Sequence, residues 1–148
     1  MNENLKLENQ LCFKIYSVSK SMIRIYGPLL KEIDLTYPQY LAMLVLWEHK
    51  KLPFKDMCFK LKMKTGTLTP ILSKLEGNGY LERIKDESDD RKIYISITQK
   101  GLDIEKKAKD IPKKIANDLN FSEEDCQKYI KEFDYLVNKL DLIENYIK

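Results

Sequence analysis

Hydrophobic residues near the start of the chain recur at alternating intervals of four and three, which is the spacing of one face of an α-helix. They predict one long helix over residues 5–31, whose last turn is kinked or loosened at Gly27-Pro28. A second helix is predicted from Thr36, a residue type that caps helix N-termini, to about His49. The apolar stripe of the first helix comprises Leu11, Ile15, Val18, Met22, Ile25 and Leu29.

Two shorter helices follow and are joined by the turn KMKTG. Pro53 predicts the start of the first, which runs to about Leu61, because proline is favoured in the opening turn of a helix. The second covers residues 67–77, and a glycine, either Gly77 or Gly79, is expected to end it. Its apolar face is formed by Leu68, Ile71, Leu72 and Leu75.

The pattern then changes to strict alternation at Ile93, Ile95 and Ile97, which predicts a half-buried strand. The segment YLERIK, residues 80–85, can pair with it, and the charged DESDD segment forms the tip of the resulting hairpin. Thr98 is expected to cap a further helix.

That helix runs through the segment KGLDIEKKAKDI and is interrupted near Pro112. The last helix is predicted to start at Ser122, because Asp125 three residues later completes a signal that resembles a capping box. Its apolar stripe comprises Cys126, Ile130, Phe133, Val137 and Leu140.

This order of elements is that of a winged helix-turn-helix, so we predict a mainly α protein with a small β-hairpin wing. Residues 35–98 would form the DNA-binding domain, and residues 1–34 and 99–148 a helical dimerisation region. Each terminal helix carries an apolar stripe that so small a module cannot cover. We therefore expect a two-fold homodimer built from the N- and C-terminal helices.

Composition restricts the class of protein. A chain of 148 residues is long enough for one domain, and no apolar run approaches the roughly 18 residues of a membrane span. The segment MNENLKLENQ lacks the pattern of a signal peptide, so we expect a cytoplasmic protein without membrane contact. The three cysteines are unpatterned, which predicts neither a disulfide scaffold nor a metal site, and no cofactor motif is present.

Charge is unevenly distributed, although the net charge is only +3. Residues 50–75 contain seven lysines against one acid, Asp56, which leaves a local charge of +6. Such a patch favours contact with a polyanion, whereas the alternative is an ordinary solvated lysine-rich face.

The helix of residues 67–77 is the candidate DNA reader, because short hydroxyl side chains near its N-terminal end can reach base edges or phosphates. At the hairpin tip, Lys85, Arg91 and Lys92 add positive charge, and an arginine on a thin wing can enter a minor groove. The alternative is a helical hairpin with ordinary surface threonines. The candidate reading residues are Thr65, Thr67, Thr69, Pro70, Ser73 and Lys74.

Four segments carry a resemblance to a known family: NQLCFKIY, LTYPQYLAMLVLWE, TGTLTPILSKLE and DDRKIYISITQKG. They resemble the MarR family of bacterial winged-helix repressors, and in particular its OhrR branch, which senses organic hydroperoxide through an N-terminal cysteine. The resemblance runs from about Leu7 to Pro112. It implies that Asp89 braces Arg91 in the minor groove. Cys58, where a small residue is usual, and Lys64, where an acid is usual, depart from the family pattern.

The resemblance also implies that Cys12 is the sensing thiol and that Tyr26 and Tyr37 hydrogen-bond to it. Cys12 and Tyr26 lie fourteen residues apart on one predicted helix, or roughly 21 Å. Tyr26 can therefore reach only the Cys12 of a partner chain. Donation by tyrosine hydroxyls favours the thiolate, whereas the helix dipole should add little if the helix starts near residue 5.

The expected function is a DNA-binding transcriptional regulator, a repressor whose dimer reads a near-palindromic operator in major grooves about 34 Å apart. Organic hydroperoxide would oxidise Cys12 to a sulfenate, which a low-molecular-weight thiol or Cys126 can trap, and the dimer would release its DNA. One alternative is a MarR-type regulator of a broader gene set, or one that responds to a small aromatic ligand. A thiol peroxidase is the other, but in an enzyme the wing and reading helix have no role.

Overall fold

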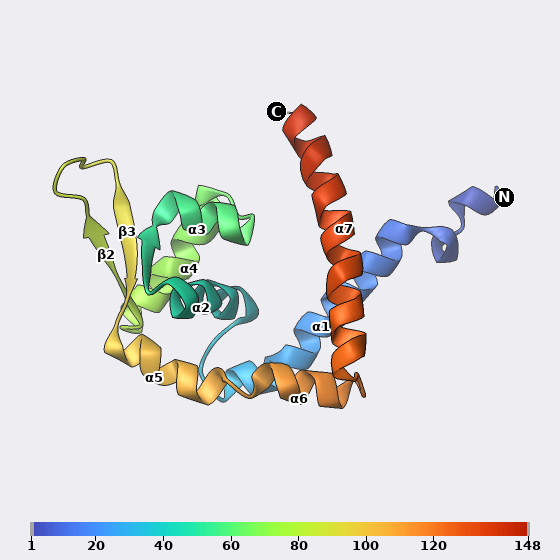
Figure 1. Ribbon diagram of the computed structural model, residues 1–148, viewed down its shortest axis with the longest axis horizontal. Helices are drawn as coiled ribbons and strands as arrows, with labels where there is room; N and C mark the ends of the chain where they lie inside the picture. The colour runs from blue at the N-terminus through green and yellow to red at the C-terminus, as the bar shows by residue number, and fades with distance from the viewer. Residues whose placement is uncertain (1, 148) are drawn as a thin grey trace. The chain divides into compact units, whose positions relative to one another are not determined.

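A computed structural model describes the backbone of residues 2–147 and the side chains of residues 2–144. Figure 1 shows the order of the elements along the chain. One compact unit ends at Lys109 and a second begins at Asp110. The first unit holds the winged helix-turn-helix together with the first long helix. Among the described helices, none is long and apolar enough to cross a membrane.

The first long helix, α1 (Leu11–Lys31), begins six residues later than predicted from the apolar pattern. Two short 3₁₀ helices, η1 (Glu3–Leu5) and η2 (Leu7–Asn9), precede it. The predicted helical start was wrong because Lys6 and Gln10 have extended backbones that interrupt the hydrogen-bond ladder. The side chain of Gln10 also donates to the Lys6 carbonyl, 3.2 Å away. Further along, the helix continues through Pro28.

The helix α2 (Tyr37–His49) supplies much of the core, and its start is confirmed as predicted. Thr36 Oγ1 accepts from the Gln39 N–H at 3.4 Å, and Gln39 Oε1 accepts from the Thr36 N–H at 2.9 Å. This reciprocal pair satisfies two of the free N–H groups at the helix start. The buried hydrophobic residues of the helix are Tyr40, Ala42, Met43, Val45, Leu46 and Trp47.

Two helices form the reading motif, α3 (Phe54–Leu61) and α4 (Thr65–Gly77). Lys62 adopts a left-handed conformation (φ 52°) that ends α3 and turns the chain toward α4. At the far end of α4, Gly79 has φ 78° and the N–H of Tyr80 donates to the carbonyl of Leu75 at 3.0 Å. The predicted apolar side is confirmed, since Leu68, Leu72 and Leu75 are fully buried.

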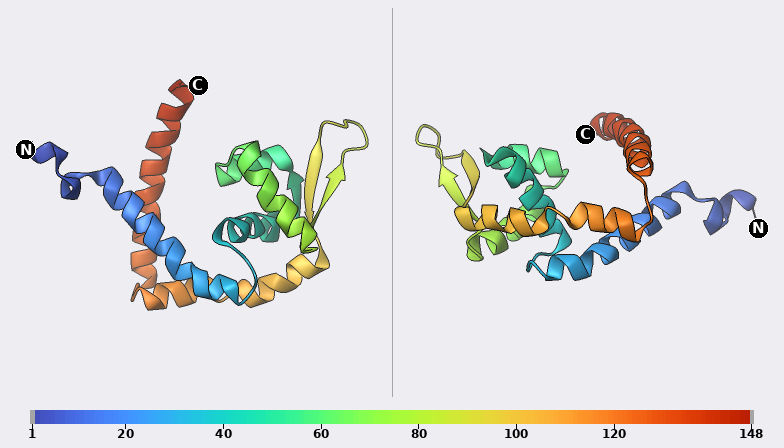
Figure 2. Two further views of the ribbon diagram at one scale, coloured as in Figure 1. Left: turned by 180° about the vertical axis from the view of Figure 1, so that it is seen from behind. Right: turned by 60° about the horizontal axis from the view of Figure 1, so that its bottom comes forward.

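A three-stranded antiparallel sheet replaces the predicted two-stranded hairpin. The hairpin itself, β2 (Leu81–Lys85) and β3 (Ile93–Ile97), is confirmed, and Figure 2 shows its loop extending beyond the helices of the same unit. The additional strand, β1 (Lys51–Pro53), pairs with the other edge of β3. Its three residues are too few to show an alternating pattern.

The helix α5 (Gln99–Ala108) starts at Thr98 as predicted and fixes the base of the wing. Thr98 Oγ1 donates to the Gly79 carbonyl at 2.6 Å and accepts from the Gly101 N–H at 3.2 Å. The Trp47 indole N–H donates to the Gly101 carbonyl at 2.9 Å. A Cβ on Gly101 would lie only 2.3 Å from the carbonyl oxygen of Tyr80, so this contact requires glycine.

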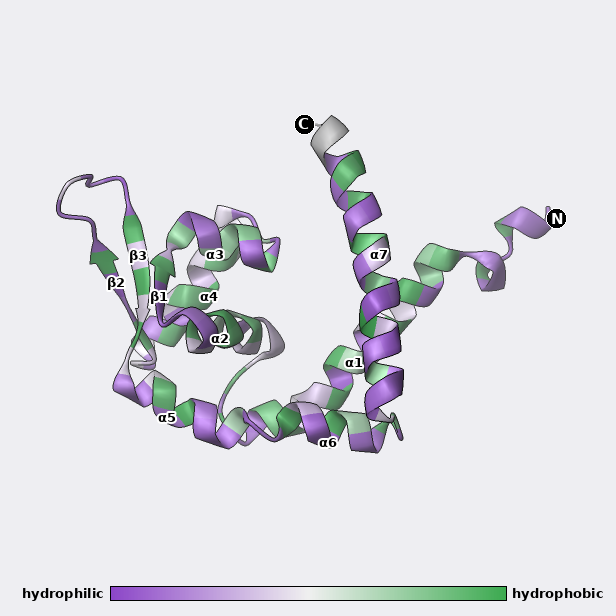
Figure 3. Ribbon diagram, viewed as in Figure 1, coloured by the Kyte–Doolittle hydropathy of each residue, from purple (hydrophilic) through white to green (hydrophobic). Residues whose placement is uncertain are grey.

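The second unit contains α6 (Ile111–Asp118) and α7 (Glu123–Ile147). The predicted cap of the last helix is confirmed, because Asp125 N–H donates to Ser122 Oγ at 3.0 Å and Asp125 Oδ2 accepts from the Ser122 N–H at 2.9 Å. Figure 3 shows hydrophobic and hydrophilic residues interleaved along α7. Its exposed hydrophobic residues include Ile130, Phe133, Val137, Leu140, Leu142 and Ile143.

Candidate functional site

The helix α4 has one buried apolar face and one exposed polar face. All six candidate reading residues on it are exposed: Thr65, Thr67, Thr69, Pro70, Ser73 and Lys74. Two of the hydroxyls donate to the helix itself, Thr69 Oγ1 to the Thr65 carbonyl at 2.8 Å and Ser73 Oγ to the Thr69 carbonyl at 3.0 Å. In this arrangement each of these oxygens has its proton engaged and offers lone pairs to an incoming donor.

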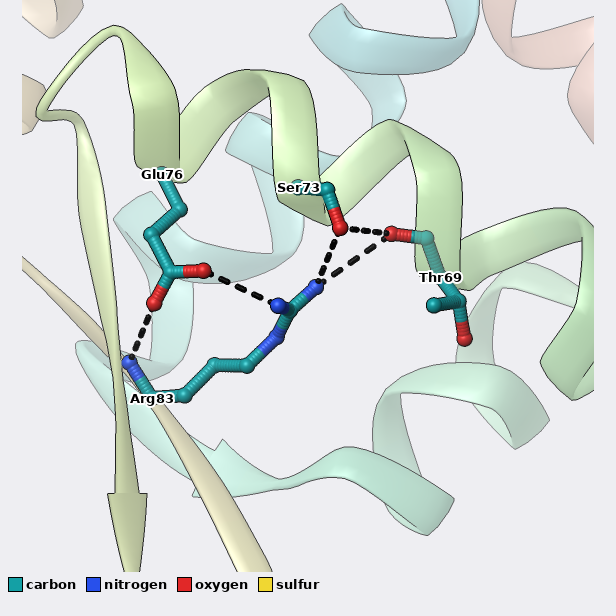
Figure 4. Close-up of polar contacts among 4 residues, drawn as sticks. All are labelled: Thr69, Ser73, Glu76 and Arg83. Atoms are coloured by element: carbon teal, nitrogen blue, oxygen red, sulfur yellow. Dashed lines mark hydrogen bonds and ion pairs between the residues drawn. The ribbon is translucent and has the colours of Figure 1, made fainter.

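Arg83 on β2 lies along this helix and was not among the predicted residues (Figure 4). Its Nη1 contacts Glu76 Oε2 at 2.9 Å, and its Nη2 donates to Ser73 Oγ at 3.0 Å and to the Thr69 carbonyl at 3.3 Å. The alternating pattern of β2 could have indicated that Arg83 faces the helices, because it places Arg83 on the same face as the buried Leu81.

The loop between β2 and β3 is predominantly hydrophilic (Figure 3) and contains Arg91. Asp89 Oδ1 accepts from the backbone N–H of Arg91 at 3.0 Å and from its Nε at 3.2 Å. The Arg91 side chain nevertheless remains 92% exposed. Lys85 and Lys92 are exposed as well. The acid that the resemblance pairs with the wing arginine therefore does contact it here.

Asp86 stabilises the first turn of this loop. Its Oδ1 accepts from the Ser88 hydroxyl at 2.6 Å and from the Ser88 N–H at 2.8 Å. These hydrogen bonds, the side-chain one foremost, lower the pKa of the Asp86 carboxyl below its usual value, so the group is ionised at neutral pH. The loop thus has a hydrogen-bonded turn next to the exposed side chain of Arg91.

The lysines of residues 50–75 are exposed, as the charge pattern indicated. Some of them also contact neighbours: Lys50 Nζ lies 3.5 Å from Glu105 Oε2, and Lys51 Nζ lies 5.1 Å from the centre of the Tyr94 ring. Both contacts are solvent-accessible and weak. The surface therefore retains its positive charge beside α4.

Cys12 is exposed and lies in the first turn of α1, as the second residue of the helix. The helix start near residue 5 that was assumed for Cys12 was wrong, because the helix starts at Leu11. The unpaired N–H groups of the first turn favour a negative charge at this end of the helix. Cys58 and Cys126 are half-buried, and all three cysteines are free.

Tyr26 and Tyr37 are brought together at the other end of α1. Their ring centres lie 5.1 Å apart in an edge-to-face arrangement, and a third ring, that of Tyr40, lies 5.8 Å from Tyr26. Burial raises the pKa of all three phenols, that of Tyr40 to about 12. Their hydroxyls therefore remain protonated donors at neutral pH. Tyr40 was not among the predicted site residues, although its spacing of three from Tyr37 on one helix places both on the same side.

The thiol and the tyrosine cluster lie toward opposite ends of one helix. Fourteen residues separate Cys12 from Tyr26 within α1, which corresponds to roughly 21 Å along the axis. One chain by itself therefore does not join them.

A pocket of about 260 Å³ lies where the end of α1, the start of α2 and the end of α4 meet. Its charged lining residues are Lys31, Asp34 and Lys74. Among the described residues, no group of three or more His, Cys, Asp or Glu side chains is placed to hold a metal ion.

Comparison with known proteins identifies the family. Residues 24–111 match the model of the transcriptional regulators SarA/Rot. The organic hydroperoxide resistance transcriptional regulator of Bacillus subtilis (strain 168) is 44% identical over 126 residues, which cover 85% of this chain and 86% of that protein. The HTH-type transcriptional regulator SarZ of Staphylococcus epidermidis is 36% identical over 137 residues, or 93% of each chain.

Solved structures of AbfR, a protein of Staphylococcus epidermidis, are similar along almost the whole chain. Reduced AbfR bound to DNA has a TM-score of 0.80 and 33% identity, over 96% of this chain and 97% of that one. Overoxidised AbfR bound to DNA has a TM-score of 0.74 and 30% identity, over 93% and 97% of the two chains. Disulfide-formed AbfR has a TM-score of 0.63 and 32% identity, over 96% and 95%. The chain thus belongs to the SarA/Rot-type transcriptional regulators of the MarR family, with a winged-helix fold.

Proposed function

We propose that this regulator is a homodimeric repressor that releases its operator when organic hydroperoxide oxidises Cys12. The observation that carries the proposal is the exposed thiol in the first turn of α1, separated by the length of the helix from a cluster of protonated tyrosines. The similarity to a regulator of organic hydroperoxide resistance supports the same reading.

In the reduced state, α4 would lie in the major groove and Arg91 in the adjacent minor groove. The exposed hydroxyls of α4 and the exposed lysines beside it support this placement, since phosphate contacts position the protein and short polar side chains reach base edges. The apolar residues exposed on α7 support a two-fold dimer, which would place two such helices about 34 Å apart on a near-palindrome.

The thiol chemistry needs no further catalytic group. The Cys12 thiolate attacks one oxygen of the hydroperoxide; an S–O bond forms, the O–O bond breaks, and the alkoxide leaves as an alcohol after it takes a proton. The sulfur loses two electrons and becomes a sulfenate, while the peroxide is reduced. In the dimer, a thiolate at Cys12 would face the hydroxyls of Tyr26 and Tyr37 of the other chain.

Release would follow because an oxidised sulfur no longer fits beside those hydroxyls. To weaken operator binding 100-fold, oxidation must favour the released geometry by about 2.7 kcal/mol, which is within the usual range of coupling between two sites. AbfR is bound to DNA in an overoxidised form and is also found with a disulfide. We therefore expect that complete release here requires the sulfenate to form a disulfide, with a low-molecular-weight thiol or with Cys126.

The first test is binding of the reduced protein to the DNA upstream of its own gene, measured by fluorescence anisotropy before and after cumene hydroperoxide. Wild type should lose affinity, whereas Cys12→Ser should bind as before and not respond. Cys58→Ser serves as the matched control, because that residue lies on α3, outside the proposed sensing site, and the variant should respond as wild type does. Cys126→Ser separates the two disulfide routes: without added thiol, release of wild type but not of this variant assigns the second thiol to Cys126. Release of both only after a low-molecular-weight thiol is added assigns it to that thiol.

The alternative hypothesis is a regulator that a small ligand releases from DNA, and the pocket beside α2 is the candidate ligand site. If Cys12→Ser still releases DNA on addition of the inducer, the ligand reading holds. Sustained consumption of peroxide with a thiol reductant would instead indicate a peroxidase.

A further inference from the structure

Arg83 is the one strongly bonded cation of the wing that the proposed contacts with DNA do not use. We propose that Arg83 is a positioning residue that holds the wing against the reading helix, so that α4 and Arg91 enter the DNA in one fixed geometry. This inference rests on the proposed placement of α4 and the wing on DNA.

A single guanidinium spans two turns of α4 (Figure 4). Its three partners, Thr69, Ser73 and Glu76, are spaced by four and three residues and therefore form one stripe along the helix. Nη2 is shared between Ser73 Oγ at 3.0 Å and the Thr69 carbonyl at 3.3 Å, and Nη1 contacts Glu76 Oε2 at 2.9 Å. The planar, forked geometry of arginine suits this set of acceptors, and a lysine ammonium does not.

Glu76 fixes the strand as well as the side chain. Its Oε1 accepts from the backbone N–H of Arg83 at 3.3 Å, while its Oε2 binds the guanidinium. Both side chains are partly shielded, at 29% and 38% exposure, so their attraction is screened less than that of a fully exposed pair. One residue of β2 is thereby bonded to the last turns of α4 through backbone and side chain together.

These contacts distinguish Arg83 from Arg91. Both arginines contact a carboxylate, but Arg83 also donates through Nη2 to Ser73 and Thr69 of α4, and its side chain is only 29% exposed. The Arg91 side chain is 92% exposed, and its one carboxylate partner lies in the same loop. Arg91 is thus accessible to DNA, and Arg83 acts on binding through the elements that it joins.

We call the contacts of Arg83 with Thr69, Ser73 and Glu76 the brace. The position of these contacts in the wing explains why they matter. β2 continues only two residues past Arg83, to Lys85, and the loop of residues 86–92 that carries Arg91 follows it. A tilt of β2 at Arg83 would therefore displace this loop and Arg91. The β2–β3 pairing carries such a tilt to the whole wing, because Arg83 lies opposite Ile95 in the ladder.

The test combines two ways of breaking the brace with a variant that removes the wing contact. Arg83→Lys keeps the charge but loses the fork, and Glu76→Ala removes the carboxylate and leaves Arg83 intact. We expect each to weaken operator binding about tenfold in the wild-type background, and less than twofold in the Arg91→Ala background, where the wing has already lost its contact in the minor groove. Glu82→Ala removes an exposed acid from the other face of β2 and should not weaken binding.

The sign of the Glu76→Ala effect separates positioning from direct contact. If Arg83 itself bound phosphate, loss of the neighbouring acid would strengthen binding, and Arg83→Gln in the Arg91→Ala background would lower the salt slope by about 0.9. Either result, or unchanged affinity for both brace variants, overturns the inference. Thermal unfolding of each variant within a few degrees of wild type shows that the fold is intact. If wild type does not bind the DNA, the proposed function fails as well, which the brace variants alone cannot cause.

Discussion

The proposed DNA-reading region and the proposed sensing region of this regulator differ in what one chain provides. In the reading region, charged side chains are paired within one chain. Arg83 of the wing contacts Glu76 of α4, and Arg91 contacts Asp89 within the wing. In the sensing region, Cys12 and the tyrosines lie toward opposite ends of α1. A single chain therefore forms the reading surface, whereas the proposed thiol site requires a second chain.

That difference suggests how oxidation acts. A reading region held by its own hydrogen bonds has no reason to change shape when a distant sulfur is oxidised. A site shared between two chains, by contrast, is sensitive to anything that alters their contact. In the proposed mechanism, oxidation changes the spacing of two intact reading regions and leaves each region unaltered. The following predictions test whether one chain alone forms the reading region and whether two chains share the thiol site.

The largest effect is expected at the base of the wing, from Gly101→Ala. The added Cβ would meet the Tyr80 carbonyl at 2.3 Å and Ile97 Cγ1 at 2.7 Å, so the backbone must shift. We expect the free energy of unfolding to fall by about 3 kcal/mol, as in other overpacked sites. Urea unfolding followed by circular dichroism measures it.

Gly66→Ala is the matched control, because nothing lies within 4 Å of the position its Cβ would take. It lies within α4, where alanine is favoured over glycine, so stability should be unchanged or raised by up to about 1 kcal/mol. Equal losses in the two variants would mean that the contact between α5 and the base of the wing does not hold the reading region together.

Tyr40→Phe should reduce the loss of stability at high pH. The pKa of Tyr40 is raised to about 12 in the folded chain by burial and by Tyr26 and Tyr37, from 10 in an unfolded one. Because the folded state holds the proton more tightly, stability is present below pH 10 and is lost as the pH rises toward 12. At about 1.4 kcal/mol per pH unit, wild type should lose up to about 2.7 kcal/mol more than the variant. Urea unfolding at pH 9 and 12 gives the difference, and identical losses would show that Tyr40 is not buried as described.

Local sequence patterns predicted most of the fold because caps and periodicity act over a few residues. Thr36, Thr98 and Ser122 each start a helix where expected. The start of α1 was missed, since it depends on the backbone conformation of Gln10 and the apolar pattern continues across that break. β1 was missed because it exists through pairing with β3, some forty residues away in the sequence.

The candidate site shows the same limit. Exposure of the hydroxyls on α4 followed from helical spacing alone. The brace at Arg83 did not, because its role depends on which face of β2 meets α4. Tyr26 and Tyr37 were named only through the family resemblance, as partners of Cys12. Their contact with each other and with Tyr40 needed the packing of α1 on α2.

Arg91→Ala tests the reading region from the DNA side. An exposed arginine in a minor groove favours the narrow groove of A·T-rich DNA, so binding should weaken about tenfold, or about 1.4 kcal/mol, when the bases under the wing are A·T-rich. The loss should be smaller for the same operator with G·C pairs at those positions. Anisotropy titrations of both duplexes measure it, with Asp90→Ala as a control that removes a neighbouring exposed charge without weakening binding. An equal loss on both duplexes would indicate a phosphate contact instead.

The smallest expected effect, about fivefold or about 1 kcal/mol in the rate of Cys12 oxidation, comes from removing the hydroxyls of Tyr26 and Tyr37. The informative form of this experiment is a mixed dimer. One chain carries Tyr26→Phe and Tyr37→Phe but keeps its thiol, and the other carries Cys12→Ser but keeps both tyrosines. If the tyrosines serve the thiol of the other chain, the single remaining thiol has an intact site and reacts with cumene hydroperoxide at the wild-type rate.

The homodimer of the double phenylalanine variant is the control for this mixed dimer, and its thiols should react about fivefold more slowly. A slow thiol in both dimers would place the effect within one chain, which the roughly 21 Å between Cys12 and Tyr26 on α1 does not allow without unfolding of that helix. A fast thiol in both would mean that the hydroxyls do not assist oxidation at all. The cluster would then matter only for packing, and oxidation of Cys12 would not require a second chain.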